Sequence, residues 1–260
     1  MIVATWTVNS IRARMPIVVA WIDRVQPDLL CLQETRVDDP QFPGESLEAL
    51  GYHLAFRGGK GRNGVAVLSR APIEEVHVGI DDGGPPDEDR LLMARVGGVP
   101  IVNTYVPQGR DPDHPMFAVK LAWFERLRAF FERRFNPEGP LLWVGDLNVA
   151  PLPIDVHDPV RLDGQIGYHP RERDALAETA SWGFVDVFRR HVTDGGQYTF
   201  YDYRARDPVS RGIGWRVDHI LATAPLAERS TAAWIDTGPR VAERPSDHTP
   251  LVAEFRGHKP

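Results

Sequence analysis

The segment that carries the clearest chemistry in this sequence is 141–148, which reads Leu-Leu-Trp-Val-Gly-Asp-Leu-Asn. Its run of bulky apolar residues predicts a buried strand whose end carries a carboxylate, Asp146, and an amide, Asn148. Side chains alternate along a strand, so this spacing places both groups on one face. A charge at the edge of a core is unfavourable unless a metal, a partner or a substrate offsets it. The pair is therefore a candidate for a reactive site.

Other apolar runs in the chain also end in polar residues of the types that enzymes use. These residues are Asn9, Glu34, Asn103, Tyr105, Asp218, Asp247 and His248. The two-residue spacing places Asn103 and Tyr105 on a shared strand face. Because amide, carboxylate, phenol and imidazole groups recur at the ends of several predicted strands, we expect them to share one polar cleft.

Glu34 follows the apolar run that ends at Gln33, and two interpretations of it are open. It is either a surface glutamate at the start of a loop or a ligand for a hard, oxygen-seeking cation such as Mg²⁺. Magnesium sites use one or two carboxylates and leave other positions to water and phosphate. Asn9 and Asp247 could complete or flank that site.

His248 is a candidate for taking up a proton or binding a phosphate near neutral pH. A histidine works best when a carboxylate holds one ring nitrogen, and its neighbour Asp247 points away in an extended chain. Asp218 on another strand is the candidate partner. Asp146 could be a general base for water or a proton donor to a leaving oxygen. Tyr105 could bind a phosphate oxygen or pack as an aromatic at the rim.

Composition limits the class of protein. The chain has 260 residues, of which 42% are apolar, enough for a substantial core. Its formal net charge of -6 argues against a protein that coats nucleic acid without specificity. That charge does not exclude a nuclease, because a bound divalent cation reverses the local sign of acidic ligands. The single cysteine, Cys31, excludes an internal disulfide and fits a reducing compartment.

No apolar stretch approaches the roughly 20 residues that cross a bilayer, and predicted structure from Ile2 leaves no room for a signal peptide. We therefore expect a cytoplasmic protein that does not engage membranes. No linker rich in Gly, Pro or Ser divides the chain, so residues 1–260 are expected to form a single domain. The acidic segment 81–89 is interpreted as a solvated turn.

Periodicity predicts more strands than helices. Helices are expected at about 15–26, 44–50, 115–135 and 170–183. Strands are expected throughout the rest of the chain, near 2–8, 28–33, 52–56, 64–69, 74–79, 90–96, 99–106, 140–147, 184–188, 215–222, 230–236 and 250–256. Sheets with helices outside them indicate a layered α/β sandwich.

Taken together, these segments resemble the exonuclease III family of abasic-site DNA-repair endonucleases, within the endonuclease/exonuclease/phosphatase fold group. The resemblance runs nearly end to end and is carried by the order and spacing of its motifs. These lie at residues 6–12, 32–35, 64–69, 103–109, 113–115, 145–151, 181–189, 198–204, 214–218 and 246–250. The resemblance implies a four-layer αββα sandwich with two packed mixed β-sheets.

The resemblance also implies roles for single residues. Glu34 matches the principal metal ligand, with Asn9 and Asp247 nearby, and the expected ion is Mg²⁺, for which Mn²⁺ can substitute. The resemblance implies that Tyr105 and His248 contact the phosphate and that Asp218 is the partner of His248. It also implies that Asp146 and Asn148 activate the attacking water. The main departure from the family is Thr7, which stands where Asn is usual and falls within the expected cleft; Ser10 also stands where Gly is commoner.

Duplex DNA with abasic sites or blocked 3′ ends is the partner that the resemblance implies, bound by a monomer. Phe200 and Trp215 match aromatics that line the pocket for a flipped-out abasic sugar. The glycine-rich segment 57–64 carries cations suited to backbone phosphates. The residues expected to bind DNA are Arg12, Lys60, Arg62, Asn103, Gln108, Arg204 and Arg211.

The predicted activity is Mg²⁺-dependent incision of DNA 5′ to abasic sites, together with 3′-5′ exonuclease or 3′-end cleaning. Water would attack phosphorus in line while the metal and His248 neutralise charge on the phosphate. Two alternatives stay open. One is a phosphoesterase of the same fold that acts on lipid head groups. The other is a DNA-damage-binding protein with weakened catalysis, which the substitution at Thr7 suggests.

Overall fold

Two six-stranded β-sheets form the centre of the computed structural model, which describes residues 1–59 and 61–257. The strands of the first sheet are β1 (Ile2–Thr7), β2 (Leu29–Gln33), β3 (His53–Arg57), β4 (Val65–Ser69), β11 (Ser230–Ile235) and β12 (Leu251–Phe255). They are arranged in the order β11-β12-β1-β2-β4-β3. The β1–β2 pair is parallel and the other neighbouring pairs are antiparallel.

The second sheet repeats this mixed arrangement. Its strands are β5 (Ile73–Val78), β6 (Leu91–Val96), β7 (Val99–Tyr105), β8 (Leu142–Asp146), β9 (Phe184–Asp186) and β10 (Asp218–Thr223), in the order β5-β6-β7-β8-β10-β9. Only the β7–β8 pair is parallel among these described strands. The prediction of two mixed sheets is therefore confirmed.

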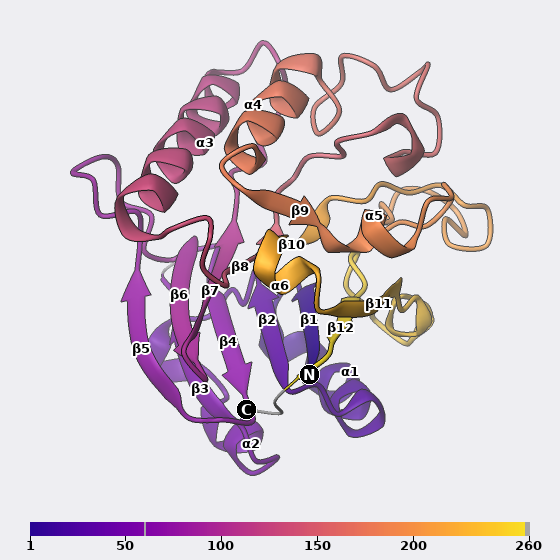
Figure 1. The fold of residues 1–260 in the computed structure, drawn as a ribbon. Coiled ribbons are helices and arrows are strands. Elements are labelled where there is room, and N and C mark those ends of the chain that lie inside the picture. Colours follow the sequence, from indigo (N-terminus) through magenta and orange to yellow (C-terminus); the bar gives the residue numbers. More distant parts are fainter. Residues whose placement is uncertain (60, 258–260) are drawn as a thin grey trace.

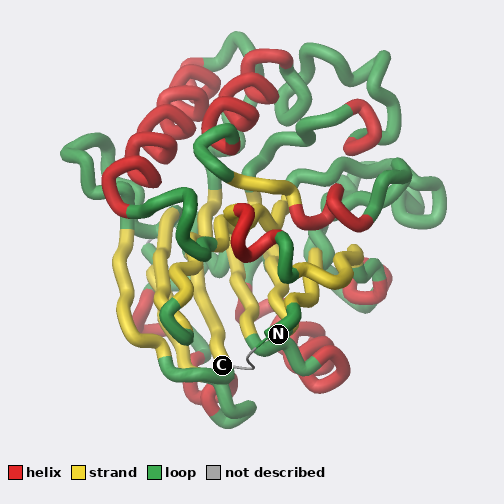
Figure 2. Tube along the Cα trace, viewed as in Figure 1, coloured by secondary structure: helices red, strands yellow, loops and turns green. Residues whose placement is uncertain are grey.

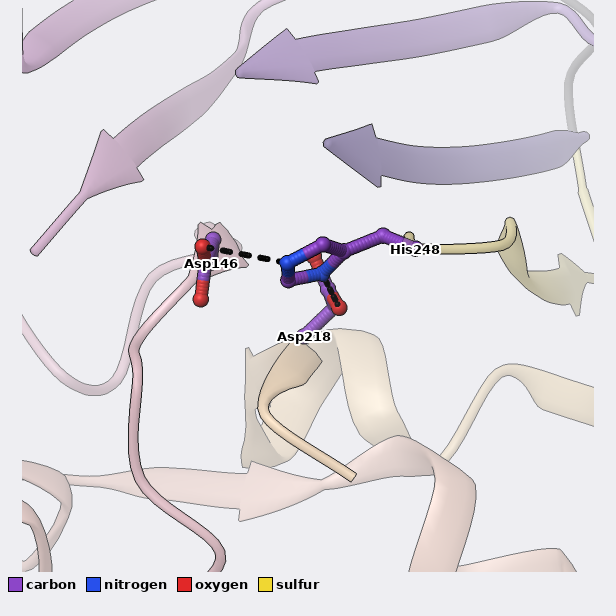
Figure 3. A group of neighbouring side chains, drawn as sticks. All are labelled: Asp146, Asp218 and His248. Atoms are coloured by element: carbon purple, nitrogen blue, oxygen red, sulfur yellow. Dashed lines mark hydrogen bonds and ion pairs between the residues drawn. The ribbon is translucent and has the colours of Figure 1, made fainter. Parts of the chain in front are cut away.

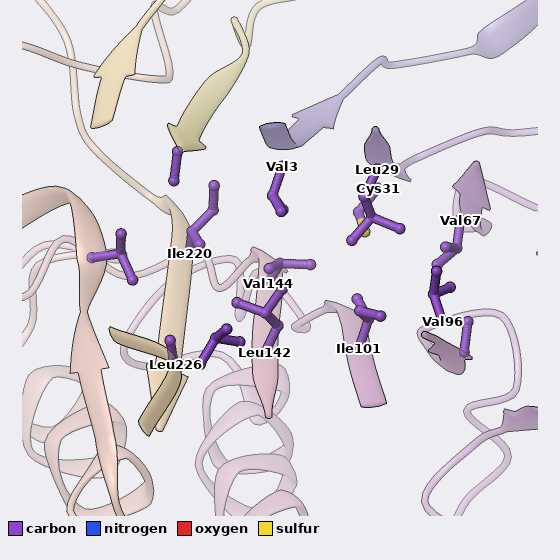
Figure 4. Close-up of a cluster of buried hydrophobic side chains, with 14 of the residues drawn as sticks. Val3, Leu29, Cys31, Val67, Val96, Ile101, Leu142, Val144, Ile220 and Leu226 are labelled. Carbon is purple, nitrogen blue, oxygen red and sulfur yellow. The ribbon is translucent and has the colours of Figure 1, made fainter. Parts of the chain in front are cut away.

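The main core lies between the two sheets. Figure 4 shows Val3, Cys31 and Val67 of the first sheet facing Ile101 and Val144 of the second. Strands that are buried on both faces need apolar residues at every position, which explains the continuous apolar runs of β2 and β8. Burial raises the pKa of the Cys31 thiol, so this cysteine packs as a small neutral hydrophobe.

Helices cover the two outer faces, as Figures 1 and 2 show. Helices α1 (Ile11–Val25) and α2 (Gly44–Glu48) pack on the first sheet, and α3 (Pro115–Arg134) and α4 (Pro170–Ala180) pack on the second. The order of layers is helix, sheet, sheet, helix, as predicted. None of the helices in the described part of the chain has both the length and the apolar character that crossing a bilayer requires.

Short helices occupy the loops, and the start of one long helix, α1, differs from the prediction. The short helices are α5 (Val187–His191), α6 (Ala224–Ala227), η1 (Asp39–Gln41), η2 (Pro153–Asp155) and η3 (Gly238–Val241). Helix α1 begins before the predicted residue 15, because Ile11 is buried against the sheet and starts the apolar stripe. His114 caps α3, since its ring nitrogen accepts from the Met116 amide at 3.0 Å.

Candidate active site

Three neighbouring strands of the second sheet bring Tyr105, Asp146 and Asp218 to one level. Tyr105 pairs with Asp146 across the parallel β7–β8 ladder, and Asp146 pairs with Asp218 across the antiparallel β8–β10 ladder. Glu34 follows β2 of the first sheet, and His248 precedes β12 of the same sheet. Glu34, Tyr105, Asp146 and His248 line one cleft with a volume of about 320 Å³. Asp218 is fully buried next to it, where it bonds His248. The predicted convergence of strand ends is therefore present in the structure.

His248 lies between the two aspartates, as Figure 3 shows. Its Nδ1 is 2.7 Å from Asp218 Oδ2, and its Nε2 is 4.0 Å from Asp146 Oδ2. The three side chains are buried, with Asp218 fully enclosed. The predicted Asp218–His248 pair is formed, and it directs the second ring nitrogen toward Asp146 and the cleft.

Charge and burial shift the pKa values of all three groups. Burial alone would lower the pKa of His248, but the carboxylates of Asp218 and Asp146 raise it to about 10. Burial disfavours ionised Asp218, yet the adjacent imidazolium and the hydrogen bond from Thr7 hold its pKa below the usual value. Burial raises the pKa of Asp146 well above its usual range; His248 opposes this shift, and the charges of Asp218 and Glu34 reinforce it. These shifts favour a cationic His248 paired with an ionised Asp218, and they disfavour ionisation of Asp146.

Tyr105 and Glu34 form a second contact that joins the two sheets. The Tyr105 hydroxyl donates to Glu34 Oε1, and Arg36 donates to Glu34 Oε2 at 2.6 Å. The guanidinium of Arg90 lies 4.8 Å from the centre of the Tyr105 ring. Burial and the neighbouring Glu34 raise the pKa of Tyr105, so its phenol keeps the proton that it donates.

The residues predicted to bind a metal supply oxygen donors next to this contact. Asn9 donates its side-chain amide to Asp247 Oδ1 at 2.8 Å, which leaves the amide oxygen as the possible ligand atom. Glu34 and Asp247 both line the cleft. A second set is also close: Asp146, Asp218 and His248 each place one ligand atom within 4.8 Å of the others. Carboxylate and amide oxygens fit a hard divalent cation.

Asn148 leaves β8 with a left-handed backbone, φ 53°. Its amide nitrogen donates to Asp146 Oδ1 at 2.9 Å, and its side-chain Nδ2 donates to the Val106 carbonyl at 2.9 Å. These two bonds fix Asn148 and Asp146 relative to each other. Both residues line the cleft, so the structure brings the predicted pair together.

Two aromatic side chains, Phe200 and Trp215, form part of the cleft wall. Phe200 and Trp215 pair with each other through an isolated backbone bridge, and Phe200 also bridges to His248. The Phe200 and His248 ring centres are 5.0 Å apart. Arg204 lines the same wall and is 91% exposed, with Asp202 accepting its hydrogen bonds. The predicted aromatic pocket therefore lies directly beside His248.

The other residues predicted to bind DNA differ in whether they line the cleft. Gln108 is exposed and lines the cleft. Arg12, Arg62 and Arg211 are exposed at positions outside the cleft lining, and Arg12 donates to Gln41 at 2.9 Å. Lys60 lies outside the described residues.

The prediction that Asn103 binds DNA is wrong. Asn103 is fully buried between the sheets, where its Nδ2 donates to the carbonyls of Leu32 and Ala66 and its Oδ1 accepts from Gln33. It shares a strand face with Tyr105, as expected, but lies two residues deeper along β7. At that depth the face meets the other sheet, so Asn103 joins the sheets.

Thr7 also lies deeper than predicted. Its side chain is fully buried behind Asp218, and its hydroxyl donates to Asp218 Oδ1 at 2.8 Å. Two further residues that the sequence interpretation missed are Lys120 and Glu172, which form a fully buried ion pair beneath the cleft. A lysine within the apolar stripe of α3, between Phe117 and Phe124, was the signal that could have revealed it.

Comparisons with known proteins agree with this geometry. A model of the endonuclease/exonuclease/phosphatase family matches residues 4–248. Exodeoxyribonuclease III of Haemophilus influenzae is 33% identical over 264 residues, which cover 97% of this chain and 98% of that protein.

Two solved structures are similar over almost their full length. An AP endonuclease from Archaeoglobus fulgidus is 46% identical, with a TM-score of 0.96, and the match covers 99% of this chain and 100% of that one. A 3′-5′ exonuclease from Neisseria meningitidis is 35% identical, with a TM-score of 0.95, and the match also covers 99% and 100% of the two chains.

Proposed function

Because the chain belongs to the endonuclease/exonuclease/phosphatase family, we propose that it is a DNA-repair phosphodiesterase. The observation that carries this proposal is the cleft in which Tyr105, Asp146 and His248 meet beside Phe200, with Asp218 holding His248 from behind. It combines groups that bind and hydrolyse a phosphodiester with an aromatic surface for a sugar. The names of the similar proteins, an AP endonuclease and two exonucleases, support DNA as the substrate.

The substrate we propose is duplex DNA with an abasic site, cut on its 5′ side, or with a blocked 3′ end. An abasic nucleotide has no base to unstack, so it leaves the duplex more easily than an intact one. Phe200 and Trp215 would hold the extruded sugar, and the exposed cations Arg62, Arg204 and Arg211 would contact backbone phosphates.

The cofactor we propose is Mg²⁺, with Mn²⁺ as a substitute. Glu34, Asp247 and the amide oxygen of Asn9 would hold it, since the three supply hard oxygen donors on neighbouring loops. When bound, the cation supplies positive charge to the phosphate oxygens.

The side chains of the cleft have separate roles in the proposed reaction. His248, held cationic by Asp218, binds a phosphate oxygen through Nε2, and the Tyr105 phenol donates to another. Asn148 orients the attacking water, because its side chain is fixed next to Asp146. Asp146 is the group that exchanges a proton with the reacting oxygen.

The test is cleavage of a duplex that contains a tetrahydrofuran abasic site, with Mg²⁺ or with EDTA. The native chain should cut 5′ to the site only with the metal, and Asp146→Ala should lose that activity. A native chain that leaves the duplex intact, or an Asp146→Ala variant that cuts at the native rate, would contradict the assignment. A panel with inositol and sphingolipid phosphoesters, which we expect not to react, tests the lipid alternative.

The damage-binding alternative rested on Thr7 and has less support once Thr7 is placed. Its hydroxyl donates a hydrogen bond to Asp218, the carboxylate that bonds His248, and this contact favours an ordered pair. This alternative predicts tight binding of abasic DNA without turnover at saturating Mg²⁺ or Mn²⁺, which the same assay detects.

We also propose that residues 1–260 act as one domain and as a monomer in the cytoplasm. The shared core between the sheets, with the cleft built from both of them, supports one domain. The buried free thiol of Cys31 fits a reducing compartment.

A further inference from the structure

Lys120 is a cation on the apolar face of a helix. It lies on α3 in the buried stripe that includes Phe117, Trp123 and Phe124, and its side chain is 0% exposed. A buried ammonium is strongly unfavourable unless it is paired and fully hydrogen-bonded. Lys120 Nζ meets this need with three acceptors: the Glu172 carboxylate, the Asn148 carbonyl at 2.7 Å and the Gln108 carbonyl at 3.4 Å.

Glu172 extends the same network to another segment. It lies in the first turn of α4, and its Oε2 accepts from the backbone amides of Gly167 at 2.7 Å and His169 at 3.1 Å. The His169 bond belongs to the cap of α4 and has an ordinary structural role. The bond to the Gly167 amide lies outside this cap, and it fixes the loop before the helix.

The groups that this ion pair holds are wall residues of the cleft. Gln108, Asn148 and Gly167 all line it, although they belong to three separate loops. The Gly167 carbonyl in turn accepts from the Ala150 amide at 2.7 Å, which ties the loop to the segment after Asn148. The ion pair itself has no exposed surface, so it reaches the substrate only through these loops.

Asn148 needs such support for a physical reason. Its backbone is left-handed, with φ 53°, a conformation that a non-glycine residue keeps only when its surroundings hold it. On one side the Asp146 carboxylate accepts from its amide, and on the other its carbonyl accepts from Lys120. Loss of the second bond removes one of these two restraints on the Asn148 backbone.

We propose that the buried Lys120–Glu172 pair is a positioning element that holds Asn148 and the Gly167 loop in the geometry that the chemical step requires. This inference rests on the proposed phosphodiesterase activity. Lys120 and Glu172 act through backbone groups and do not contact DNA. Their removal therefore slows phosphodiester cleavage while leaving the affinity for DNA in place.

The variant that tests this is Lys120→Met/Glu172→Gln, because removing both charges leaves no unpaired buried ion. In single-turnover cleavage of the abasic duplex we expect a rate about 10- to 100-fold lower, the size expected for a misplaced group near the reacting atoms. The Kd for the same duplex, measured with Ca²⁺ in place of Mg²⁺, should stay within a few fold of wild type.

Arg126→Met is the matched control. Arg126 lies on the same helix, and its guanidinium binds Asp82 and Asp87 on the far loop. This variant should lower the thermal midpoint but leave the cleavage rate unchanged. A wild-type rate in Lys120→Met/Glu172→Gln would overturn the proposal, and so would equal losses of rate in that variant and in Arg126→Met.

Two further measurements keep the proposal testable if the double variant is unstable or the wild type does not cut DNA. In an Asn148→Ala background, removing the pair should cost much less in rate than it does in wild type, because both changes act on one group. Hydrogen exchange needs no activity: the Gly167 and Ala150 amides should lose protection in the double variant but not in Arg126→Met. Unchanged protection there would refute the positioning role, whereas a wild type without cleavage would refute only the proposed function.

Discussion

Two clusters of buried charges lie at the same end of the second sheet, and they are built differently. The cleft cluster is Asp146, Asp218 and His248. The closed cluster is Asp155, Arg189 and Arg216, with Asp186 at its edge. Asp155 and Arg216 are fully buried, as Asp218 is, so burial alone does not separate a site from a structural feature.

Charge balance and hydrogen bonding do separate the two clusters. Arg216 donates to both oxygens of Asp155, at 2.6 and 3.0 Å, and to Asp186 at 2.8 Å. Positive and negative charges are equal in number there, and they satisfy one another inside the protein. The cleft cluster has two carboxyl groups for one histidine, and the Nε2 of that histidine is 4.0 Å from Asp146. Its charges need a substrate or a cation to complete them.

The largest effect that distinguishes the clusters should come from Asp146→Asn. We expect the cleavage rate to fall about 10³-fold, as is typical for the loss of a group that transfers a proton. The thermal midpoint should stay the same or rise, because the amide replaces a carboxyl group whose ionised form is disfavoured by burial and by the charges of Asp218 and Glu34. Rapid-quench cleavage and calorimetry on one preparation measure both. A large drop in the midpoint would mean that Asp146 is structural.

The opposite result should follow from Arg216→Met in the closed cluster. Removing this cation leaves Asp155 buried without its main partner, so the free energy of unfolding should fall by about 3–5 kcal/mol. Cleavage by the folded fraction at low temperature should stay close to the wild-type rate. Urea unfolding gives the first quantity. A variant that is stable but inactive would place the closed cluster in the catalytic machinery.

The closed cluster also predicts how stability depends on pH. Burial opposes ionisation of Asp155, but the charges of Arg216 and Arg189 hold its pKa below the usual 3.8. A carboxyl group with a lowered folded pKa stabilises the protein above its unfolded pKa, and this contribution disappears as the pH falls through the folded value. The difference in unfolding free energy between wild type and Asp155→Asn should therefore be largest near neutral pH and shrink below pH 3.8. A constant difference down to acid unfolding would contradict the assigned charge state.

Local patterns predicted the strands and the polar groups at their ends, because apolar runs and two-residue alternation are properties of short segments. The same alternation failed for Asn103, since it gives the face of a residue but not its depth along the sheet. Asn103 and Tyr105 share a face, yet only Tyr105 reaches the cleft. The Lys120–Glu172 pair could not be predicted from the sequence for another reason. It depends on the packing of α3 against α4, which no local pattern determines.

The smallest effect should come from Thr7, which lies behind the cleft cluster. Thr7→Val keeps the shape of the side chain and removes the hydroxyl that donates to Asp218 at 2.8 Å. One lost hydrogen bond to a charged group is worth about 1.5–3 kcal/mol, and part of this should appear as slower cleavage, because Asp218 orients His248 less firmly. Thr5→Val is the matched control, since Thr5 is equally buried and its hydroxyl bonds Gln33 but not Asp218. If both variants slow cleavage equally, the effect comes from packing between the sheets and not from the hydrogen bond to Asp218.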